Sequence, residues 1–126
     1  MLSAVTFPIH DKEGLFFNHL EKITPDLKQI YSRALVSITP PTLESQKGRV
    51  EKLQKDPFFE VVFNSPGTKV GDHFLNGYRR AVELSEPAQS LHLCALDRLA
   101  FILETGLKNE FLKDIAWAEG QEKPVL

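Results

Sequence analysis

The stretch SLHLCALD, residues 90–97, is the part of the sequence that says most about the fold. Residues 91–96 carry no charge and are almost continuously apolar. Such a run, without alternation of polar and apolar residues, is typical of a strand that is buried on both faces, as in a parallel sheet. Asp97 follows directly. The stretch therefore predicts a buried strand over residues 90–96 with a carboxylate at its end.

Three earlier stretches also favour strands. Residues 2–9 are rich in β-forming side chains, residues 33–39 form a second run, and residues 58–63 form a third. Pro40-Pro41 follows the second run, and proline cannot donate to a strand ladder. We therefore expect the second strand to end at Thr39.

Helical periodicity fills the segments between these strands. Apolar residues at steps of three and four predict a helix over residues 13–31, which Pro25 should divide into two pieces. Residues 42–55 predict a largely exposed helix with Thr42 as its cap.

A third helix is predicted over residues 72–84, with Asp72 as its cap. Residues 85–89 should end it, and two further helical segments, residues 98–104 and 107–117, follow Asp97. The apolar side chains expected to face inward along the third helix are Phe74, Leu75, Tyr78, Ala81, Val82 and Leu84.

This alternation predicts an α/β fold. Strand and helix alternate four times, which favours a Rossmann-like, mostly parallel sheet of about four strands with flanking helices. A length of 126 residues with 42% hydrophobic residues is enough for one core. We therefore expect a single domain over residues 1–118 and a flexible tail over residues 119–126.

Composition argues against several classes of partner. The 15 Lys and Arg residues nearly balance the 17 Asp and Glu residues, so no basic field exists to hold nucleic acid or an anionic membrane. Cys94 is the only cysteine, which excludes an intrachain disulfide and a cysteine-based zinc site, and we interpret it as a packing residue. No run of about 18 apolar residues predicts a membrane span, and the start of the chain has no secretory pattern, so a cytoplasmic protein is expected.

In open parallel sheets, ligands bind beyond the carboxyl ends of the strands. The polar residues at those positions are therefore the candidates for a site. They are His10, Asp11, Thr39, Asn64 with the loop to Asp72, Asp97 and Arg98.

Each candidate also has a structural interpretation. Asp97 can bind a divalent metal or a ribose, or it can cap the helix that follows. Arg79, Arg80 and Arg98 can bind a diphosphate, or they can be solvated surface residues. Gly71 and the loop before it can bind an anion at a helix N-terminus, or they can form an ordinary turn.

The spacing of the histidines argues against a histidine metal site. His10 and Asp11 are placed to contact a base or a ribose, whereas the remaining histidines are scattered without the spacing of metal ligands. No motif of a nucleophilic triad or of a phosphate-binding loop is present.

The order of these motifs resembles the donor-binding half of the GT-A glycosyltransferases, which have the nucleotide-diphospho-sugar transferase fold. Residues 5–11, VTFPIHD, are similar to the first strand motif of that fold. Asn64, Gly71 and the pair Asn76-Gly77 are similar to the segment that precedes its Asp-x-Asp strand. TPPT at residues 39–42 and LDRL at residues 96–99 resemble more closely a group of uncharacterised bacterial proteins related to this fold.

The resemblance implies a domain that binds a nucleotide or a nucleotide-sugar donor, as a glycosyltransferase does. It implies that His10, Asp11 and Asp97 contribute to that site. Together with the residues nominated by their position, the predicted binding residues are His10, Asp11, Thr39, Gly71, Arg79, Asp97 and Arg98. Asp97 corresponds to the second aspartate of the metal motif, and Ala95 stands at the position of the first, so that Mn or Mg would rest on Asp97. The chain leaves little room after residue 98 for the acceptor half, which implies a donor-side fragment.

Two other hypotheses about the function remain open. The absence of the first aspartate favours a non-catalytic α/β interaction or regulatory domain that packs on a protein partner through its open sheet edge and Trp117. A flavodoxin-like or receiver-like domain would need an acidic cluster after the first strand, where Asp11 stands alone.

Overall fold

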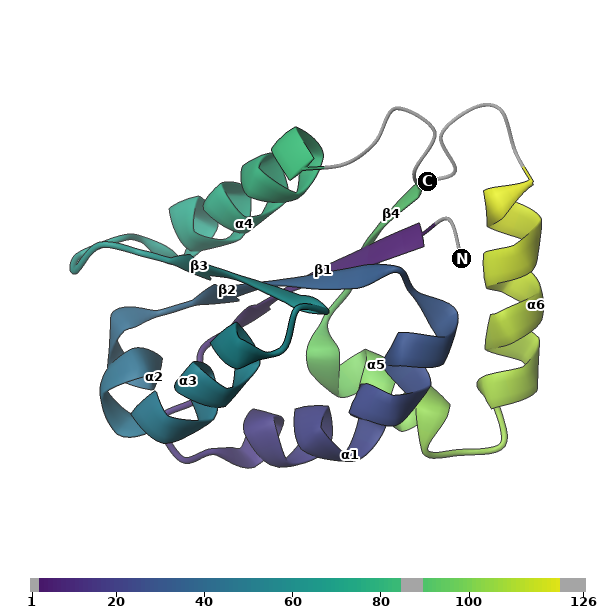
Figure 1. The fold of residues 1–126 in the computed structure, drawn as a ribbon, viewed down its shortest axis with the longest axis horizontal. Helices are drawn as coiled ribbons and strands as arrows, with labels where there is room; N and C mark the ends of the chain where they lie inside the picture. The colour runs from purple at the N-terminus through teal and green to yellow at the C-terminus, as the bar shows by residue number, and fades with distance from the viewer. Residues whose placement is uncertain (1–2, 85–89, 121–126) are drawn as a thin grey trace.

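The computed structural model describes residues 3–84 and 90–120 of the chain. They form one four-stranded, all-parallel sheet in the order β3-β2-β1-β4, with helices on both faces (Figure 1). The elements are β1 (Ser3–Ile9), α1 (Leu15–Ile30), β2 (Arg33–Ile38), α2 (Pro40–Ser45), α3 (Lys47–Lys55), β3 (Phe59–Phe63), α4 (Val70–Leu84), β4 (Ser90–Leu93), α5 (Leu96–Leu103) and α6 (Lys108–Glu119). The predicted α/β class and parallel sheet are therefore confirmed.

The register gives the sheet a stepped edge. β1 pairs with β2 along its length, from Ala4 opposite Arg33 to Ile9 opposite Ile38. β4 pairs only with residues 3–6 of β1, so the end of β1 projects beyond it. The carboxyl ends of β1, β2 and β3 consequently form one continuous rim.

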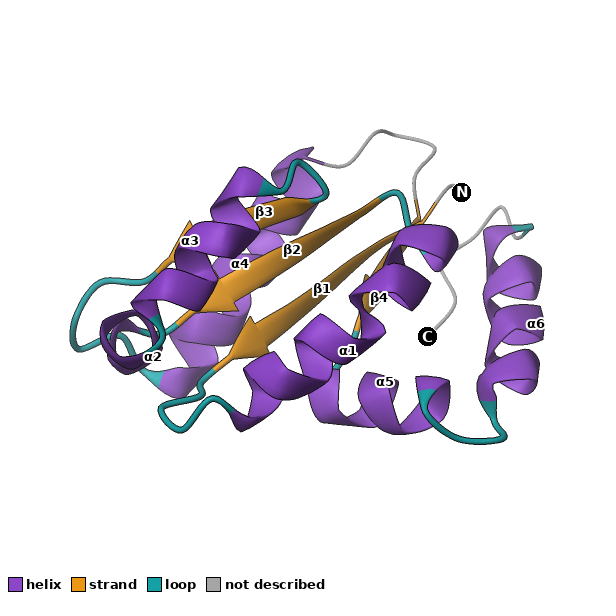
Figure 2. Cartoon of the chain, turned by 60° about the horizontal axis from the view of Figure 1, so that its bottom comes forward, coloured by secondary structure: helices purple, strands orange, loops and turns teal. Residues whose placement is uncertain are grey.

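The two faces of the sheet are covered unequally. Helices α1, α3 and α5 bury one face in the main core, together with alternate residues of β1 and β2 such as Phe7 and Val36 (Figure 2). The other face is covered by α4, which contacts all four strands. Its core is small and centres on Ala4, Leu35 and Ala81.

The helix α4 approaches the sheet through small residues. Over residues 71–84 of this helix, the buried residues are His73, Gly77 and Ala81, which are spaced by four. The predicted inward stripe was wrong in part, because Phe74, Leu75 and Val82 are 40%, 41% and 67% exposed. A close approach to the strands excludes large side chains from the inner face, which leaves them at the sides of the helix.

The helix α1 is continuous, so the predicted division at Pro25 was wrong. Proline removes one hydrogen bond, the one that the carbonyl of Glu21 would accept. Both Glu21 and Pro25 are exposed, and water can bond that carbonyl. The helix therefore passes through this position with Ile23 and Leu27 buried on its opposite side.

The segment after β2 forms two helices instead of the single predicted one. Thr39 occupies the cap position of α2, and Pro40 and Pro41 are its first residues, where no N–H is needed. The predicted cap, Thr42, is buried inside α2. Gln46 separates α2 from α3, and its side-chain amide donates to the carbonyl of Lys12 over 3.1 Å.

Helix α4 begins at Val70, so Asp72 lies in its first turn and does not cap it. The predicted break at residues 85–89 lies outside the described residues.

The strand β4 is shorter than predicted and ends at Leu93, which is 51% exposed. Leu91 and His92 are only half-buried as well, so β4 is not the strand buried on both faces that was predicted. Leu96 already belongs to α5, and Asp97 lies in the first turn of that helix, with Ala95 at the cap position.

The last helix, α6, stands at the end of the molecule opposite the carboxyl ends of β1 to β3 (Figures 1 and 2). It contains Glu119, the first residue of the predicted tail, whereas residues 121–126 lie outside the described part. In the described part of the chain, no helix combines the length and the apolar character that crossing a membrane requires.

Candidate functional site

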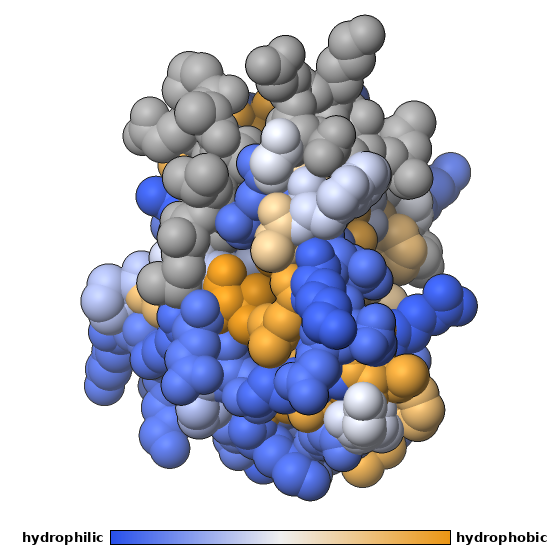
Figure 3. Space-filling model, turned by 90° about the vertical axis from the view of Figure 1, so that its right-hand side faces the viewer, coloured by the Kyte–Doolittle hydropathy of each residue, from blue (hydrophilic) through white to orange (hydrophobic). Residues whose placement is uncertain are grey.

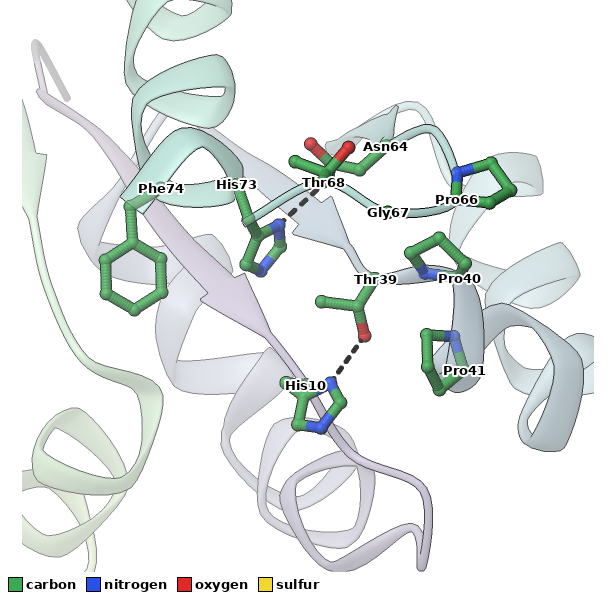
Figure 4. A pocket seen from close by; sticks show the side chains of 10 residues that line it. All are labelled: His10, Thr39, Pro40, Pro41, Asn64, Pro66, Gly67, Thr68, His73 and Phe74. Carbon is green, nitrogen blue, oxygen red and sulfur yellow. Dashed lines mark hydrogen bonds between the residues drawn. The ribbon is translucent and has the colours of Figure 1, made fainter. Parts of the chain in front are cut away.

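A pocket of about 480 Å³ lies at the carboxyl ends of β1, β2 and β3 (Figure 4). It is formed by the segments that follow each of these strands and by the first turns of α4. The residues that line it are His10, Thr39, Pro40, Pro41, Asn64, Pro66, Gly67, Thr68, His73 and Phe74. This is the position at which parallel α/β sheets bind ligands.

A chain of hydrogen bonds fixes the wall after β1. The backbone N–H of Asp11 donates to Thr42 Oγ1 over 2.7 Å, and Thr42 Oγ1 lies 2.7 Å from Thr39 Oγ1. Thr39 Oγ1 in turn lies 2.8 Å from Nδ1 of the exposed His10. With one proton on each hydroxyl, the chain can run from Thr42 to Thr39 to His10, which leaves the proton of a neutral His10 on Nε2.

Asn64 holds the opposite wall together. Its Nδ2 donates to the carbonyl of Ile38 over 3.0 Å and lies 3.0 Å from Ser37 Oγ and 2.9 Å from His73 Nδ1. Its Oδ1 accepts from Asn76 Nδ2 over 2.9 Å. One side chain after β3 thereby ties the end of β2 to the first turns of α4.

His73 is the most unusual residue of the pocket, because it is only 2% exposed and one of its ring nitrogens has no partner. Nδ1 is in the network of Asn64 and Ser37, whereas Nε2 is the one buried side-chain polar atom in the described residues without a hydrogen bond. A buried donor or acceptor that is left unsatisfied costs about 1–3 kcal/mol. Burial, with a smaller contribution from His10, lowers the pKa of His73 and favours the neutral ring.

The rest of the lining is apolar except for Thr68, and the lining carries no Lys, Arg, Asp or Glu side chain. Pro40, Pro41, Pro66 and Phe74 provide flat, rigid surface. Phe74 is 40% exposed, and Gly67 has a φ of +84°, which places the loop after β3 in a turn that glycine adopts without strain. Such a lining suits the face of a planar ring.

The nominated residues divide among several places. The pocket contains His10 and Thr39. Asp11 is 4% exposed, and its Oδ2 accepts the backbone N–H of Phe17 over 2.9 Å. It therefore stabilises the first turn of α1.

The other nominated residues lie outside this pocket. Asp97 and Arg98 are exposed and border a separate depression of about 410 Å³ on α5, and Asp97 Oδ1 accepts the backbone N–H of Arg98 over 2.9 Å. Arg79 borders a third depression on the outer side of α4. Gly71 lies in the first turn of α4, with open space where a Cβ would be.

The described residues include no group of three His, Cys, Asp or Glu side chains that could hold a metal ion. Asp97 stands there as a single carboxylate, with Ala95 two residues before it. The protein side chains alone therefore do not fit a divalent cation at this position.

Sequence reasoning missed His73, because an isolated histidine inside an amphipathic helix has no motif around it. The signal that was available is the spacing of His73, Gly77 and Ala81, which marks a narrow helix face of small residues with one polar ring at its start. Pro66 and Thr68 belong to the loop from Asn64 to Asp72, which was predicted either to bind an anion or to form an ordinary turn.

Comparisons of the chain with protein-family models, with curated proteins and with solved structures found no match.

Proposed function

We propose that the pocket at the carboxyl ends of β1, β2 and β3 binds the base and ribose of a nucleotide or nucleotide-sugar, as in the donor-binding half of a glycosyltransferase. The observation that carries the proposal is His73. Its buried Nε2 has hydrogen-bonding capacity that the described protein groups do not use, beside a pocket that is lined in large part by prolines and Phe74. A planar heterocycle with polar atoms at its edge supplies both kinds of contact.

The dimensions and the position of the pocket support the same ligand class. A volume of about 480 Å³ is within the usual range of small-molecule sites. In the proposal, Thr39 and His10, which line the pocket after β2 and β1, bond a ribose hydroxyl. The sequence resemblance to the GT-A fold leads to the same class independently of the geometry.

The phosphates of such a ligand would lie outside the pocket, because its lining has no cationic side chain. In the proposal, they extend along the sheet edge toward the end of β4, where Arg98 and Asp97 are exposed. Arg98 would then pair with a phosphate oxygen. Binding of Mn²⁺ or Mg²⁺ stays a prediction, in which the ligand's phosphates supply most of the oxygen ligands.

Catalysis is a separate part of the proposal. Transfer of a sugar would break the bond between its anomeric carbon and the diphosphate oxygen and form a bond to an acceptor oxygen. Arg98 would stabilise the negative charge on the departing diphosphate. We assign no acceptor site and no catalytic base to the described residues.

Calorimetric titration of the intact protein with nucleoside diphosphates and their sugar derivatives, with and without Mg²⁺ or Mn²⁺, tests the proposal. We expect binding by at least one nucleotide, and its loss by tenfold or more in His73→Leu. Arg79→Ala on the outer side of α4 is the matched control and should bind like the wild type. No binding by any nucleotide, or equal binding by His73→Leu, would overturn the proposal.

A second candidate function is that of a non-catalytic interaction domain. It is favoured by Phe101, Leu107 and Trp117 of the α5–α6 region, which are 61%, 50% and 60% exposed. Figure 3 views the molecule from the side of α6 and shows apolar surface between polar side chains. Sedimentation of the wild type and of Phe101→Ser over a range of concentrations tests for self-association, which this substitution should weaken.

A further inference from the structure

The strand β3 forms one side of the sheet, and its outer edge is open in the part of the chain that the structure describes. There, β2 is its one neighbouring strand, while α3 and α4 lie on its two faces (Figure 2). The backbone groups of successive strand residues point to opposite sides, so alternate residues of β3 bond to β2 and the others face outward. An open edge of this kind is a template for a further strand.

The register identifies the groups that face outward. Ala34 of β2 lies opposite Phe59, and its N–H donates to the carbonyl of Phe58 over 2.9 Å. By the alternation of a parallel ladder, residues 58, 60 and 62 therefore bond to β2. The backbone groups of Phe59, Val61 and Phe63 point away from it.

The outward groups are arranged symmetrically about Val61. The N–H of Phe59 is already used, because it donates to the carbonyl of Asp56 over 3.0 Å. If a second copy lies antiparallel with Val61 opposite Val61, the two valines exchange both of their hydrogen bonds. The N–H of each Phe63 then meets the carbonyl of Phe59 in the other copy. The pattern of outward donors and acceptors is therefore complementary to itself.

The side chains of the strand favour the same arrangement. Phe59 belongs to the main core and Val61 packs against it, so Phe63, two residues further on, points to the same face. Phe63 is 45% exposed and would lie beside Phe59 of the second copy, a type of cross-strand pair that stabilises antiparallel strands. Lysine and proline commonly protect a sheet edge, and FEVVF, residues 59–63, contains neither.

The charge of Glu60 does not oppose this pairing. Glu60 is the charged residue of β3, and it would lie opposite Val62 of the second copy. Nη2 of Arg80 in α4 is 3.6 Å from Oε1 of Glu60, so each carboxylate already has a cation beside it. No like charges would face each other directly across the two strands.

We propose that two copies of this chain associate through the outer edges of their β3 strands, antiparallel and with Val61 on the two-fold axis, so that the two sheets become one. The partner is a second copy because the outward hydrogen-bonding groups, the apolar side chains and the paired charges all match themselves about Val61. Such a two-fold contact uses the same surface on both copies and closes at the dimer. The inference does not depend on the proposed nucleotide site.

Sedimentation of the intact protein over a range of concentrations, with Val61→Pro as the variant, tests the inference. The N–H that proline lacks faces outward here, and edge strands tolerate proline at such positions. We expect the wild type to form a dimer and its dissociation constant to rise by about tenfold or more in the variant, because each copy loses a donor. Val61→Thr keeps the N–H and the branched side chain, so this matched control should dimerise like the wild type.

Phe63→Lys is a second variant, since it replaces an exposed side chain and a lysine at an edge opposes strand pairing. Circular dichroism checks that each variant is folded, and if Val61→Pro is not, Phe63→Lys decides. A wild type that is monomeric at every concentration would overturn the inference, as would folded variants that dimerise normally. A dimer that persists in Val61→Pro and is lost in Phe101→Ser would also overturn it, because the copies would then meet at the α5–α6 region.

Hydrogen exchange of single amides, followed by NMR, locates the contact in the wild type. We expect exchange at Val61 and Phe63 to slow as the protein concentration rises, because their N–H groups become bonded only in the dimer. Exchange at Val62 is the internal control, since its N–H faces β2 and should not respond in the same way. Exchange at Val61 and Phe63 that does not change while the dimer forms would overturn the inference.

Discussion

Gly77 of α4 lies directly against Ser37 of β2, at a distance that no larger residue allows. A Cβ at position 77 would be 2.9 Å from the Cβ of Ser37. One turn earlier on the same helix, the ring of His73 lies 3.0 Å from Ser37 Oγ, which also donates to the carbonyl of His73 over 3.1 Å. The close approach of α4 to β2 thus sets the position of the histidine that we assign to ligand recognition.

Gly77→Ala is predicted to destabilise the fold although alanine favours helices. The added methyl group must push α4 away from β2, and such overpacking typically costs about 1–3 kcal/mol. Urea unfolding followed by circular dichroism measures the change. Gly48→Ala in α3 is the matched control, because nothing lies within 4 Å of its added Cβ, and it should stabilise the protein by about 0.5–1 kcal/mol. Equal effects of the two substitutions would show that α4 does not depend on this contact.

Asn64→Ala should weaken both stability and ligand binding. It removes the donor to the Ile38 carbonyl and to Ser37 Oγ and the contact with His73 Nδ1, and it leaves these buried or half-buried groups without that partner. We expect a loss of about 1–3 kcal/mol in the free energy of unfolding and a larger loss of nucleotide affinity than stability alone explains. The control is Asn18→Ala, which removes an exposed side chain whose Oδ1 accepts a hydrogen bond from Arg49. If Asn64→Ala kept full affinity for nucleotides, the hydrogen bonds of Asn64 would not be needed for binding.

Asp11 is predicted to act in folding and not in binding. Its carboxylate accepts the N–H of Phe17 near the start of α1, and its own N–H bonds Thr42. Asp11→Ala should cost about 0.5–2 kcal/mol, the usual effect of losing a helix cap, whereas Asp11→Asn retains an acceptor oxygen and should cost less. Thermal unfolding of the two variants measures this difference. Unchanged stability with lost nucleotide binding would instead place Asp11 in contact with the ligand.

The stability of the protein should fall as the pH drops below about 6.5. Burial lowers the pKa of both His73 and His92 from the ordinary value of 6.5, so the unfolded chain takes up protons that the folded protein does not. The stabilisation is present above that pH and is lost as the pH falls toward the lowered pKa values. Asp56, whose pKa is lowered by its hydrogen bond from Lys28, acts in a separate range below 3.8.

Urea unfolding at about pH 7.5 and about pH 5.5 measures this effect. His73→Leu and His92→Leu should each make the stability less dependent on pH. If both leucine variants kept the full dependence of the wild type, these two histidines would not be its source.

The strand pattern could be predicted because the parallel strands are marked by apolar runs and by the turns that follow them. All four strands were predicted. For β1, β2 and β3, the predicted ends lie within one residue of those in the structure. β4 was assigned too many residues, because an apolar run gives no sign of where the sheet stops and a helix begins. Leu96 is buried in either case, as a strand residue or on the inner side of α5.

The site was only partly predictable. His10, Thr39 and Asn64 were found because they follow strands, and this rule places side chains at the rim of a parallel sheet. His73 lies in α4, which follows the loop after β3. Its position in the pocket depends on how closely α4 packs against β2. That distance is set by Gly77 and Ser37, which are far apart in the sequence.

The position of the ligand is the central claim, and an amide and histidine NMR titration of the intact protein with UDP tests it most directly. We predict that the largest shifts fall on His10, Thr39, Asn64, Thr68 and His73, the residues around the pocket. Shifts that gather around Asp97 and Arg98 and leave His73 unchanged would contradict the account.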